Sequence, residues 1–423
     1  MLVIRILLFL SLVIFINSRR SAKSKRIIIL VLGRIDQSPR MQYHALSFAK
    51  EGWEVNLVGY QDKKASGLFR SHQNIKIHAI PTLPKQFSFR SRLSFLLIAP
   101  AKILHQLLSL LFIIFKIKQS SYFLVQNPPS IPTFFLGHVL FLLRGTRFVI
   151  DWHNFGYTIL ALKLGKNHLF VKILRIYERI LAKYAYCHIT VSHSMQRVLE
   201  GWGIRPCHVC YDRPPAHFQP LQASTRTSDL QVIPADFDPR IEKLLVTSTS
   251  WTPDENIYAL WDALKMYSET QNAVPLLVLV TGKGPGKADF VKHIEKNPLE
   301  NIRFCLPWFS SEDYPRAIAC ADFGVSLHQS SSGYDLPMKV VDLFGCGVPV
   351  VAWNFPAISE LVHDNENGFI VDNYVELYKK IEMLCSDERM LQSVRQGALD
   401  ESKIRWDDEW TKTIPQLFTL DSS

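Results

Sequence analysis

Apolar residues gather in short, continuous runs along the first half of the chain. Residues 26–32, 53–59, 75–79 and 122–126 form such runs, rich in β-branched residues. Runs of this length without strict alternation are typical of parallel strands that are buried on both faces. A helical pattern over residues 41–51 separates the first two runs. This strand–helix–strand order predicts a doubly wound α/β sheet.

The same pattern continues along the rest of the chain. Further strands are expected at 147–151, 188–191, 243–247, 276–281, 302–306, 323–327 and 348–352. Residues 212–242 lack periodicity and are rich in Pro, Asp, Arg and Gln, so we interpret them as a linker. A chain of 423 residues is also too long for one compact core. We therefore predict two doubly wound domains, 27–211 and 243–423, the second ending in helices.

The first residues differ in kind from the rest. Residues 1–17 are strongly apolar, although Arg5 interrupts them, and a basic cluster follows between Arg19 and Arg26. By the positive-inside rule this basic flank stays in the cytosol. We interpret residues 1–18 as an uncleaved transmembrane anchor, although the run is slightly short for a span of about 20 residues. The alternative is a processed signal peptide, which would carry its basic residues before the apolar run.

A second apolar stretch occupies residues 94–115. Pro100, Lys102 and two other polar residues interrupt it, and basic residues flank both of its ends. A span at this position would split the first domain across the membrane. We expect a helix that lies in the plane of the bilayer surface, and the alternative is a buried helix of the α/β fold.

Composition narrows the possible partners and the compartment. The net charge of +10 favours an anionic neighbour, such as a membrane surface or a diphosphate. We expect no nucleic-acid partner, since the sequence has neither zinc-finger spacing nor a basic run interleaved with aromatic residues. The seven cysteines are scattered and odd in number, and no N-x-S/T sequon occurs. Both features fit a body that faces the cytosol.

Polar side chains follow three predicted strands of the first domain. Asn127 ends one strand, Asp151 and His153 end the next, and His193 follows another. The carboxyl ends of parallel strands meet at one edge of a sheet, where ligands bind. His153 is the preferred general base, with Asp151 orienting its ring. Asp36, Asp151 itself and His193 are the other candidates, and a turn that only packs the sheet edge is the alternative.

The second domain carries two candidate sites for a nucleotide donor. Gly282, Lys283 and Gly284 follow a buried strand, where glycines permit close approach of backbone and a lysine can meet phosphate. A turn that binds no ligand is the alternative. In the stretch 330–342, Pro337 favours a helix start, and Lys339 and Asp342 then share one helical face. A lysine at a helix N-terminus suits a diphosphate, and a carboxylate one turn later suits ribose hydroxyls.

Several sequence motifs of this chain resemble those of a known family. The pattern Pro-x-Lys-x-x-Asp, followed by Gly-x-Pro-Val-Val and Glu-Leu-Val, resembles the nucleotide-sugar domain of glycosyltransferases of the GT-B fold, in which two Rossmann-like domains face a cleft. Longer segments resemble the chitobiosyldiphosphodolichol β-mannosyltransferase family and follow one another in the family's order from about residue 27 to Trp410. These segments are Ser38–Ala45, Gln126–Pro129, Ile150–Tyr157, Ser248–Thr252, Ser330–Asp342 and Arg405–Asp407.

The resemblance implies a reaction and a location. The donor would be GDP-mannose and the acceptor the dolichol-linked chitobiose diphosphate, joined with inversion in a β1,4 linkage. The protein would be a single-pass protein of the endoplasmic reticulum membrane with a cytosolic catalytic body. Other mannosyltransferases of the pathway are possible partners. A different lipid-directed GT-B transferase and a non-catalytic anchored homologue are the alternatives.

The resemblance also assigns residues. Lys339 would meet the diphosphate and Asp342 the ribose, and the donor site would further include Ser332, Gly333 and Asp335. The acceptor-binding residues would be Gly33, Arg34, Ser38, Arg40 and Asn127.

One loop departs from the family pattern. Asp36 stands where the family's first loop has a glycine, and the charged positions around it are rearranged. This residue puts close approach of an acceptor phosphate in doubt, although Arg34 could restore the charge. No Asp-x-Asp motif stands where it would hold a metal against the nucleotide phosphates, so we expect Lys283 and Lys339 to neutralise the diphosphate without a metal or other cofactor.

Overall fold

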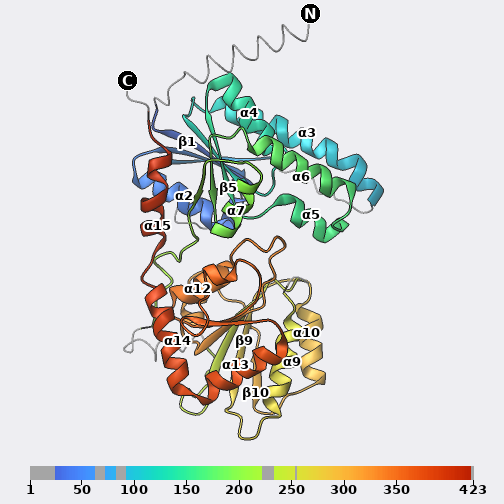
Figure 1. Cartoon of the computed structure of the whole chain (residues 1–423), viewed down its shortest axis with the longest axis vertical. Coiled ribbons are helices and arrows are strands. Elements are labelled where there is room, and N and C mark those ends of the chain that lie inside the picture. Colours follow the sequence, from blue (N-terminus) through green and yellow to red (C-terminus); the bar gives the residue numbers. More distant parts are fainter. Residues whose placement is uncertain (1–23, 62–71, 82–91, 222–232, 253–254, 421–423) are drawn as a thin grey trace, which may run out of the picture. The chain divides into compact units, whose positions relative to one another are not determined.

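The chain folds into two compact units. The computed structural model describes residues 24–61, 72–81, 92–221, 233–252 and 255–420 (Figure 1). The first unit runs to Cys210 and also contains Trp410–Ser423, whereas the second comprises Tyr211–Glu409. The predicted anchor, residues 1–18, lies outside the described residues.

The first unit is built on a seven-stranded sheet in which all neighbouring strands are parallel. The strand order is β3-β2-β1-β4-β5-β6-β7. The strands are β1 (Arg26–Arg34), β2 (Glu54–Tyr60), β3 (Ile75–Ala79), β4 (Tyr122–Asn127), β5 (Arg147–Trp152), β6 (Cys187–Thr190) and β7 (Cys207–Val209). Their side chains are mostly buried, which is why the sequence shows continuous apolar runs here.

Helices connect these strands and cover the sheet. They are α2 (Pro39–Lys50), α3 (Arg92–Lys116), α4 (Thr133–Arg144), α5 (Gly156–Leu164), α6 (Leu169–Ala182) and α7 (His193–Gly201). Figure 1 shows α3, α4 and α6 gathered on the side of the sheet away from α2. The strand order reverses between β1 and β4, so the loops after these two strands border the position where open α/β sheets bind ligands.

The second unit repeats this architecture with six parallel strands. The order is β10-β9-β8-β11-β12-β13, and it reverses between β8 and β11. The strands are β8 (Lys243–Ser248), β9 (Leu276–Thr281), β10 (Ile302–Cys305), β11 (Phe323–Ser326), β12 (Val350–Trp353) and β13 (Gly368–Val371). The helices are α9 (Ile257–Ser268), α10 (Lys287–Lys296), α11 (Asp313–Ala319), α12 (Met338–Gly345), α13 (Tyr374–Ser386) and α14 (Glu388–Glu401). A last helix, α15 (Trp406–Thr413), begins in the second unit and ends in the first.

The end of the chain belongs to the first unit, although the sequence assigned 243–423 to the second. Trp410 and Phe418 lie at ring distances of 5.1 and 4.7 Å from Phe48 of α2. The hydroxyl of Tyr122 donates a hydrogen bond of 2.7 Å to the carbonyl oxygen of Thr419. These buried aromatic contacts close one side of the first core.

Part of the predicted linker, 212–242, packs onto the second unit. Phe218 and Ile233 are buried in its core. A Cβ on Gly345 of α12 would lie 2.5 Å from Cβ of Pro214, so the segment lies directly against that helix. The described parts of the linker therefore contribute to the second core.

Helix α3 combines a buried face with an exposed apolar stripe. Leu110 and Ile114 are buried, whereas Leu104, Leu108, Phe112 and Phe115 are exposed large hydrophobic residues. Each of the two expected arrangements, a surface helix and a core helix, thus describes one face of α3. Within the residues that the structure describes, no helix is both long enough and apolar enough to cross a bilayer.

Candidate active site

A buried carboxylate organises the carboxyl edge of the first sheet. Asp151, the next-to-last residue of β5, is fully buried and lies against the guanidinium of Arg40 from α2. Nε of Arg40 donates to Oδ2 at 2.9 Å and Nη2 to Oδ1 at 3.0 Å, while Nη1 donates to the carbonyl oxygen of Cys210 at 2.9 Å. Arg40 was expected to bind the acceptor, but its side chain is 3% exposed. The structure places it as the internal partner of Asp151.

His153 lies beside the same carboxylate, as the sequence predicted. Its Nε2 is 2.8 Å from Oδ2 of Asp151, and 22% of its side chain is exposed. Burial raises the pKa of Asp151, but the charge of Arg40 and the contact with His153 outweigh it and hold this pKa well below the usual value. Because the carboxylate is ionised, it accepts a hydrogen bond from the Nε2–H of His153. In the neutral tautomer that carries its proton on Nε2, the Nδ1 atom is unprotonated and can act as a base.

His44 is a third partner of Asp151, and sequence reasoning missed it. Its Nε2 lies 3.4 Å from Oδ2 of Asp151. Its Nδ1 accepts a hydrogen bond from the indole Nε1 of Trp410 at 3.1 Å. Burial lowers the pKa of His44, so the ring is neutral and carries its proton on Nε2, facing Asp151. One carboxylate is thereby held by three side chains, two from α2 and one from the loop after β5.

In the loop after β1, Asp36 replaces the glycine of the family pattern. Arg34 and Asp36 form an exposed ion pair with 2.6 Å between Nη2 and Oδ2. Ser38 precedes α2, and its hydroxyl donates to the carbonyl oxygen of Arg34 at 3.3 Å. Around Gly33, a Cβ would meet only Val31, at 3.8 Å. The four residues thus lie between the end of β1 and the start of α2, and part of the charge of Arg34 is offset by Asp36.

Asn127 and Glu178 hold the neighbouring loop. Asn127, an expected acceptor ligand, is fully buried; its amide nitrogen donates to the carbonyl oxygen of Asn154 at 3.1 Å and to Glu178 at 3.4 Å. Glu178 of α6 accepts the backbone N–H of Gly156 at 2.9 Å, and sequence reasoning missed it. Burial raises the pKa of Glu178 to about 7. Both side chains therefore act as internal supports of the strand-end loops.

In the second unit, the two glycines after β9 lie directly against the loop after β8. A Cβ on Gly282 would lie 1.8 Å from the carbonyl oxygen of Thr249, and φ of Gly282 is +138°. A Cβ on Gly284 would lie 1.9 Å from the carbonyl oxygen of Ser250. Close approach of the two loops is by itself sufficient reason for glycine here. Binding of a donor by these residues stays a prediction.

Two lysines border these loops. The ammonium of Lys283 lies 3.9 Å from the ring centroid of Trp308. Lys339 of α12 forms an ion pair with Glu255, a mostly buried carboxylate that the sequence analysis did not single out. Glu255 also accepts the backbone N–H of Ser250 at 2.6 Å and the hydroxyl of Thr249 at 2.9 Å. Burial raises the pKa of Glu255, but Lys339 and the hydrogen bonds from Ser250 and Thr249 together outweigh burial and lower this pKa, so the carboxylate is ionised.

Asp342 lies one turn after Lys339 on α12. The hydroxyl of Tyr314 is 3.5 Å from Oδ2 of Asp342 and 2.9 Å from Oγ of Ser248. Burial raises the pKa of Asp342 to about 7, and the nearby Asp212 adds to this effect while Lys339 opposes it. A carboxylate that is poor in internal donors suits a ligand that brings hydroxyl groups.

The serine-rich loop before α12 is held by Asp335. This carboxylate accepts hydrogen bonds from the hydroxyls of Ser330 and Ser332 and from Nε2 of His328, the last two at 3.2 Å. Gly333 has φ of +81° and donates its N–H to Oγ of Ser330 at 2.7 Å. A β-bridge joins His328 to Glu255. The predicted donor residues therefore gather at the carboxyl edge of the second sheet, beside its switch point.

The described residues contain no group of three or more His, Cys, Asp or Glu side chains that could hold a metal ion.

Two parallel, doubly wound units with these strand-end loops define the class of protein, a glycosyltransferase of the GT-B fold. The chain superposes on sucrose-phosphate synthase from Thermosynechococcus elongatus with a TM-score of 0.67 and 14% identity, over 92% of this chain and 96% of that one. Residues 242–387 match the sequence model of the family "Glycosyl transferases group 1".

The particular family follows from close relatives. The chain is 42% identical to the chitobiosyldiphosphodolichol beta-mannosyltransferase of Candida albicans, covering 95% of this chain and 90% of that protein. It is also 42% identical to the protein of the same name in Yarrowia lipolytica, covering 94% and 87%. The chain belongs to the chitobiosyldiphosphodolichol beta-mannosyltransferase family.

Proposed function

We propose that this protein transfers mannose from GDP-mannose to dolichol-linked chitobiose diphosphate, forming a β1,4 linkage with inversion. The names of its relatives support the acceptor and the sugar. The observation that carries the chemistry is the hydrogen bond of 2.8 Å between His153 and a buried, ionised Asp151 at the carboxyl edge of the first sheet.

The acceptor hydroxyl must lose a proton as its oxygen attacks the anomeric carbon. Nδ1 of His153 takes this proton, and the resulting imidazolium is stabilised by the carboxylate of Asp151. The new C–O bond forms on one face of the sugar while the bond to the diphosphate breaks on the other, which inverts the configuration. The departing group is GDP, whose added negative charge needs cationic partners.

In the second unit, Lys339 and Lys283 supply positive charge for the diphosphate, and Asp342 accepts ribose hydroxyls. Glu255 holds Lys339 by an ion pair at the N-terminus of α12, where the helix dipole also favours an anion. We propose that the diphosphate shares Lys339 with Glu255 when the donor binds.

The experiment is a transfer assay with the purified full chain. It would be incubated with GDP-mannose and a lipid diphosphate chitobiose, and the product would be digested with a β-mannosidase. The proposal expects a mannosylated product that this enzyme trims. Transfer from another nucleotide sugar alone would indicate a different lipid-directed transferase. GDP binding without transfer of any sugar would indicate a non-catalytic homologue.

We further propose that residues 1–18 anchor the protein in the endoplasmic reticulum membrane with its body in the cytosol, where other mannosyltransferases of the pathway could bind it. The basic residues after the apolar run support this orientation. The exposed stripe Leu104, Leu108, Phe112 and Phe115 of α3 supports a second contact with the bilayer.

Protease protection in sealed microsomes tests the orientation. A cytosolic body would be digested without detergent, and its survival until detergent is added would contradict the proposal. For the second contact, a form that lacks residues 1–26 should still bind anionic vesicles. Replacing the four stripe residues by serine in that form should release it, with GDP affinity unchanged.

A further inference from the structure

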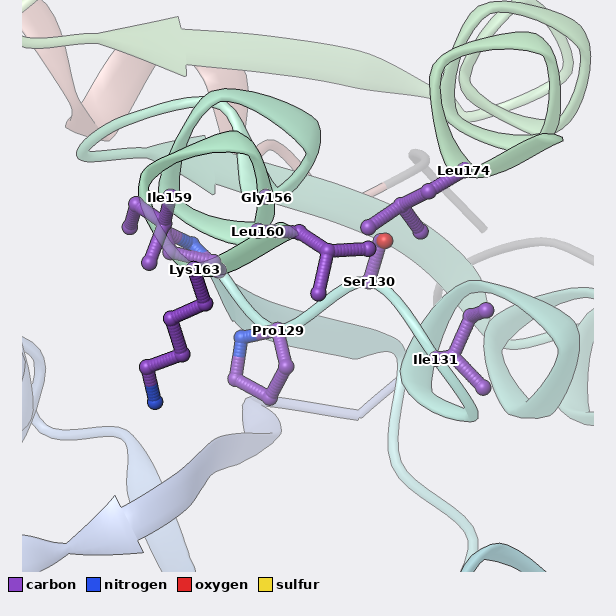
Figure 2. A pocket seen from close by; sticks show the side chains of 9 residues that line it. Pro129, Ser130, Ile131, Gly156, Ile159, Leu160, Lys163 and Leu174 are labelled. Carbon is purple, nitrogen blue, oxygen red and sulfur yellow. The ribbon is translucent and has the colours of Figure 1, made fainter. Parts of the chain in front are cut away.

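An apolar hollow opens beside the loop that follows β4. It has a volume of about 320 Å³, within the range of roughly 300–1,000 Å³ that is usual for small-molecule sites. Pro129 and Ile131 line it from the loop, Ile159 and Leu160 from α5, and Leu174 from α6. Figure 2 shows Leu160 projecting between Pro129 and Leu174. These apolar side chains can pack against a branched hydrocarbon.

The hollow is joined directly to the loop of the proposed base. The backbone N–H of His153 donates to the carbonyl oxygen of Asn127 at 2.9 Å, and the lining loop begins at the next residue. Gly156, three residues after His153, begins α5 and also lines the hollow. Glu178 accepts the N–H of Gly156, which ties the hollow's wall to the sheet edge. The hollow therefore adjoins the loop that carries His153.

One lining residue is a cation. Lys163, on the last turn of α5, is exposed, and Figure 2 shows its side chain extending beside Pro129 on the side away from Leu174. The other residues that line the hollow carry no charge. A single ammonium beside an apolar hollow suits a ligand in which an anionic group is joined to a hydrocarbon.

The apolar surface continues beyond the hollow. Leu162 of α5 is 64% exposed, and Ile173, Ile176 and Ile180 of α6 are about half exposed. Such a surface would let a long hydrocarbon chain leave the hollow along apolar side chains. The whole of a dolichol chain does not fit 320 Å³, so only its first units could lie inside.

We propose that this hollow binds the isoprene units next to the diphosphate of the lipid acceptor, with Lys163 meeting the diphosphate. This assignment rests on the proposed function and adds a lipid subsite to it. The hollow selects for a prenyl chain because burying branched hydrocarbon there removes apolar surface from water.

The test measures KM for chitobiose diphosphates that carry one, two or four isoprene units, at a constant detergent concentration. With the full-length wild-type chain, KM should fall roughly tenfold from one unit to four. Leu160→Gln should remove most of this gain, because it should raise KM for the four-unit acceptor by a larger factor than KM for the one-unit acceptor. Ile131→Gln, on a different element, should act in the same way.

Two control variants separate the contribution of the hollow from those of the outer apolar surface and of the charge on Lys163. Leu162→Gln lies on the same helix outside the hollow and should keep the dependence on chain length. Lys163→Gln should raise KM for all three acceptors by a similar factor, since it would act on the diphosphate. Unchanged melting temperatures show that the first unit of each variant is folded.

The outcomes distinguish this inference from the proposed function. A chain-length gain that survives in both Leu160→Gln and Ile131→Gln overturns the subsite while leaving the transfer reaction in place. An equal loss in Leu162→Gln would assign the gain to the outer surface and also overturn it. Failure of the wild-type chain to modify any acceptor overturns the proposed function and the subsite together.

Discussion

The indole Nε1 of Trp410 donates a hydrogen bond of 3.1 Å to Nδ1 of His44, a residue 366 positions earlier in the chain. This bond fixes the tautomer of His44, whose other nitrogen faces Asp151. Trp410→Phe keeps the aromatic packing and leaves Nδ1 without its donor. We expect a loss of stability of about 1–3 kcal/mol, the usual cost of an unsatisfied buried group, seen as a lower melting temperature.

The matched control is Trp261→Phe. Trp261 is half-buried in the second unit, and its Nε1 has no hydrogen-bond partner within the described residues. That variant should melt close to the wild type. Equal melting temperatures for both variants would show that the bond to His44 contributes nothing.

The second prediction concerns the base. His153→Ala should lower kcat by about 10²–10⁴, which is the usual contribution of general acid–base catalysis, with GDP affinity unchanged. His193→Ala is the control, because that histidine was also a candidate and its ring is hydrogen-bonded to Gln196 at 2.9 Å. Steady-state kinetics at saturating donor would measure kcat for both variants. A larger loss of kcat in His193→Ala would identify His193 as the base instead.

The third prediction concerns the ribose. Asp342→Ala should weaken GDP binding by about 1–3 kcal/mol, because the ribose hydroxyls lose their acceptor. Asp342→Asn, which keeps one acceptor oxygen, should lose less. Asp262→Ala on α9 is the control in the same unit. Calorimetric GDP affinities that match the wild type in Asp342→Ala would place the ribose elsewhere.

The fourth prediction is a pH dependence of stability that arises at Glu178. Its pKa in the folded state is about 7, above the ordinary value of 4.5, so folding favours the protonated carboxyl. Its favourable contribution is complete below pH 4.5 and is lost as the pH rises through 7. Glu178→Gln still accepts the N–H of Gly156 and cannot ionise.

We therefore expect the variant to gain stability relative to the wild type between pH 5 and pH 8. Its upper limit is about 3 kcal/mol, from 1.36 kcal/mol per pKa unit. Melting temperatures of both proteins across this range give the difference, and the titration of Asp342, present in both, cancels. A difference that does not change with pH would show that Glu178 is ionised throughout.

The fifth prediction concerns metal ions. In the proposed function Lys283 and Lys339 neutralise the diphosphate, so transfer should continue in EDTA at an unchanged rate. The control is a repeat with added Mg²⁺ or Mn²⁺. Loss of activity in EDTA that either ion restores would contradict the role given to the lysines.

Most of the fold could be predicted because buried parallel strands leave continuous apolar runs. The strands at 75–79 and 276–281 were predicted with the bounds that they have in the structure. β7 and β13 were missed, since they are short strands at the edges of their sheets and contain too few residues for a pattern. The return of Trp410 to the first unit was also missed, because a helix reveals its apolar face but not its partner.

The site could be predicted only where its residues are close together in the sequence. The pair Asp151 and His153 was visible because both follow one strand. The direction in which Arg40 points depends on tertiary packing, so its burial could not be read from its motif. Glu255 and Glu178 belong to no motif, although a signal existed: each is a carboxylate close to apolar residues that become buried.

The placement of Trp410 also has a consequence for biosynthesis. The ribosome finishes Cys210 about 200 residues before it reaches Trp410, which at roughly 5–20 residues per second is a delay of about 10–40 s. Throughout this interval the first domain has emerged with Phe48 and His44 still lacking their partners from the C-terminal segment. Nascent chains arrested before residue 410 should therefore be open to protease and chaperone binding at this face, and completion of the polypeptide should close it.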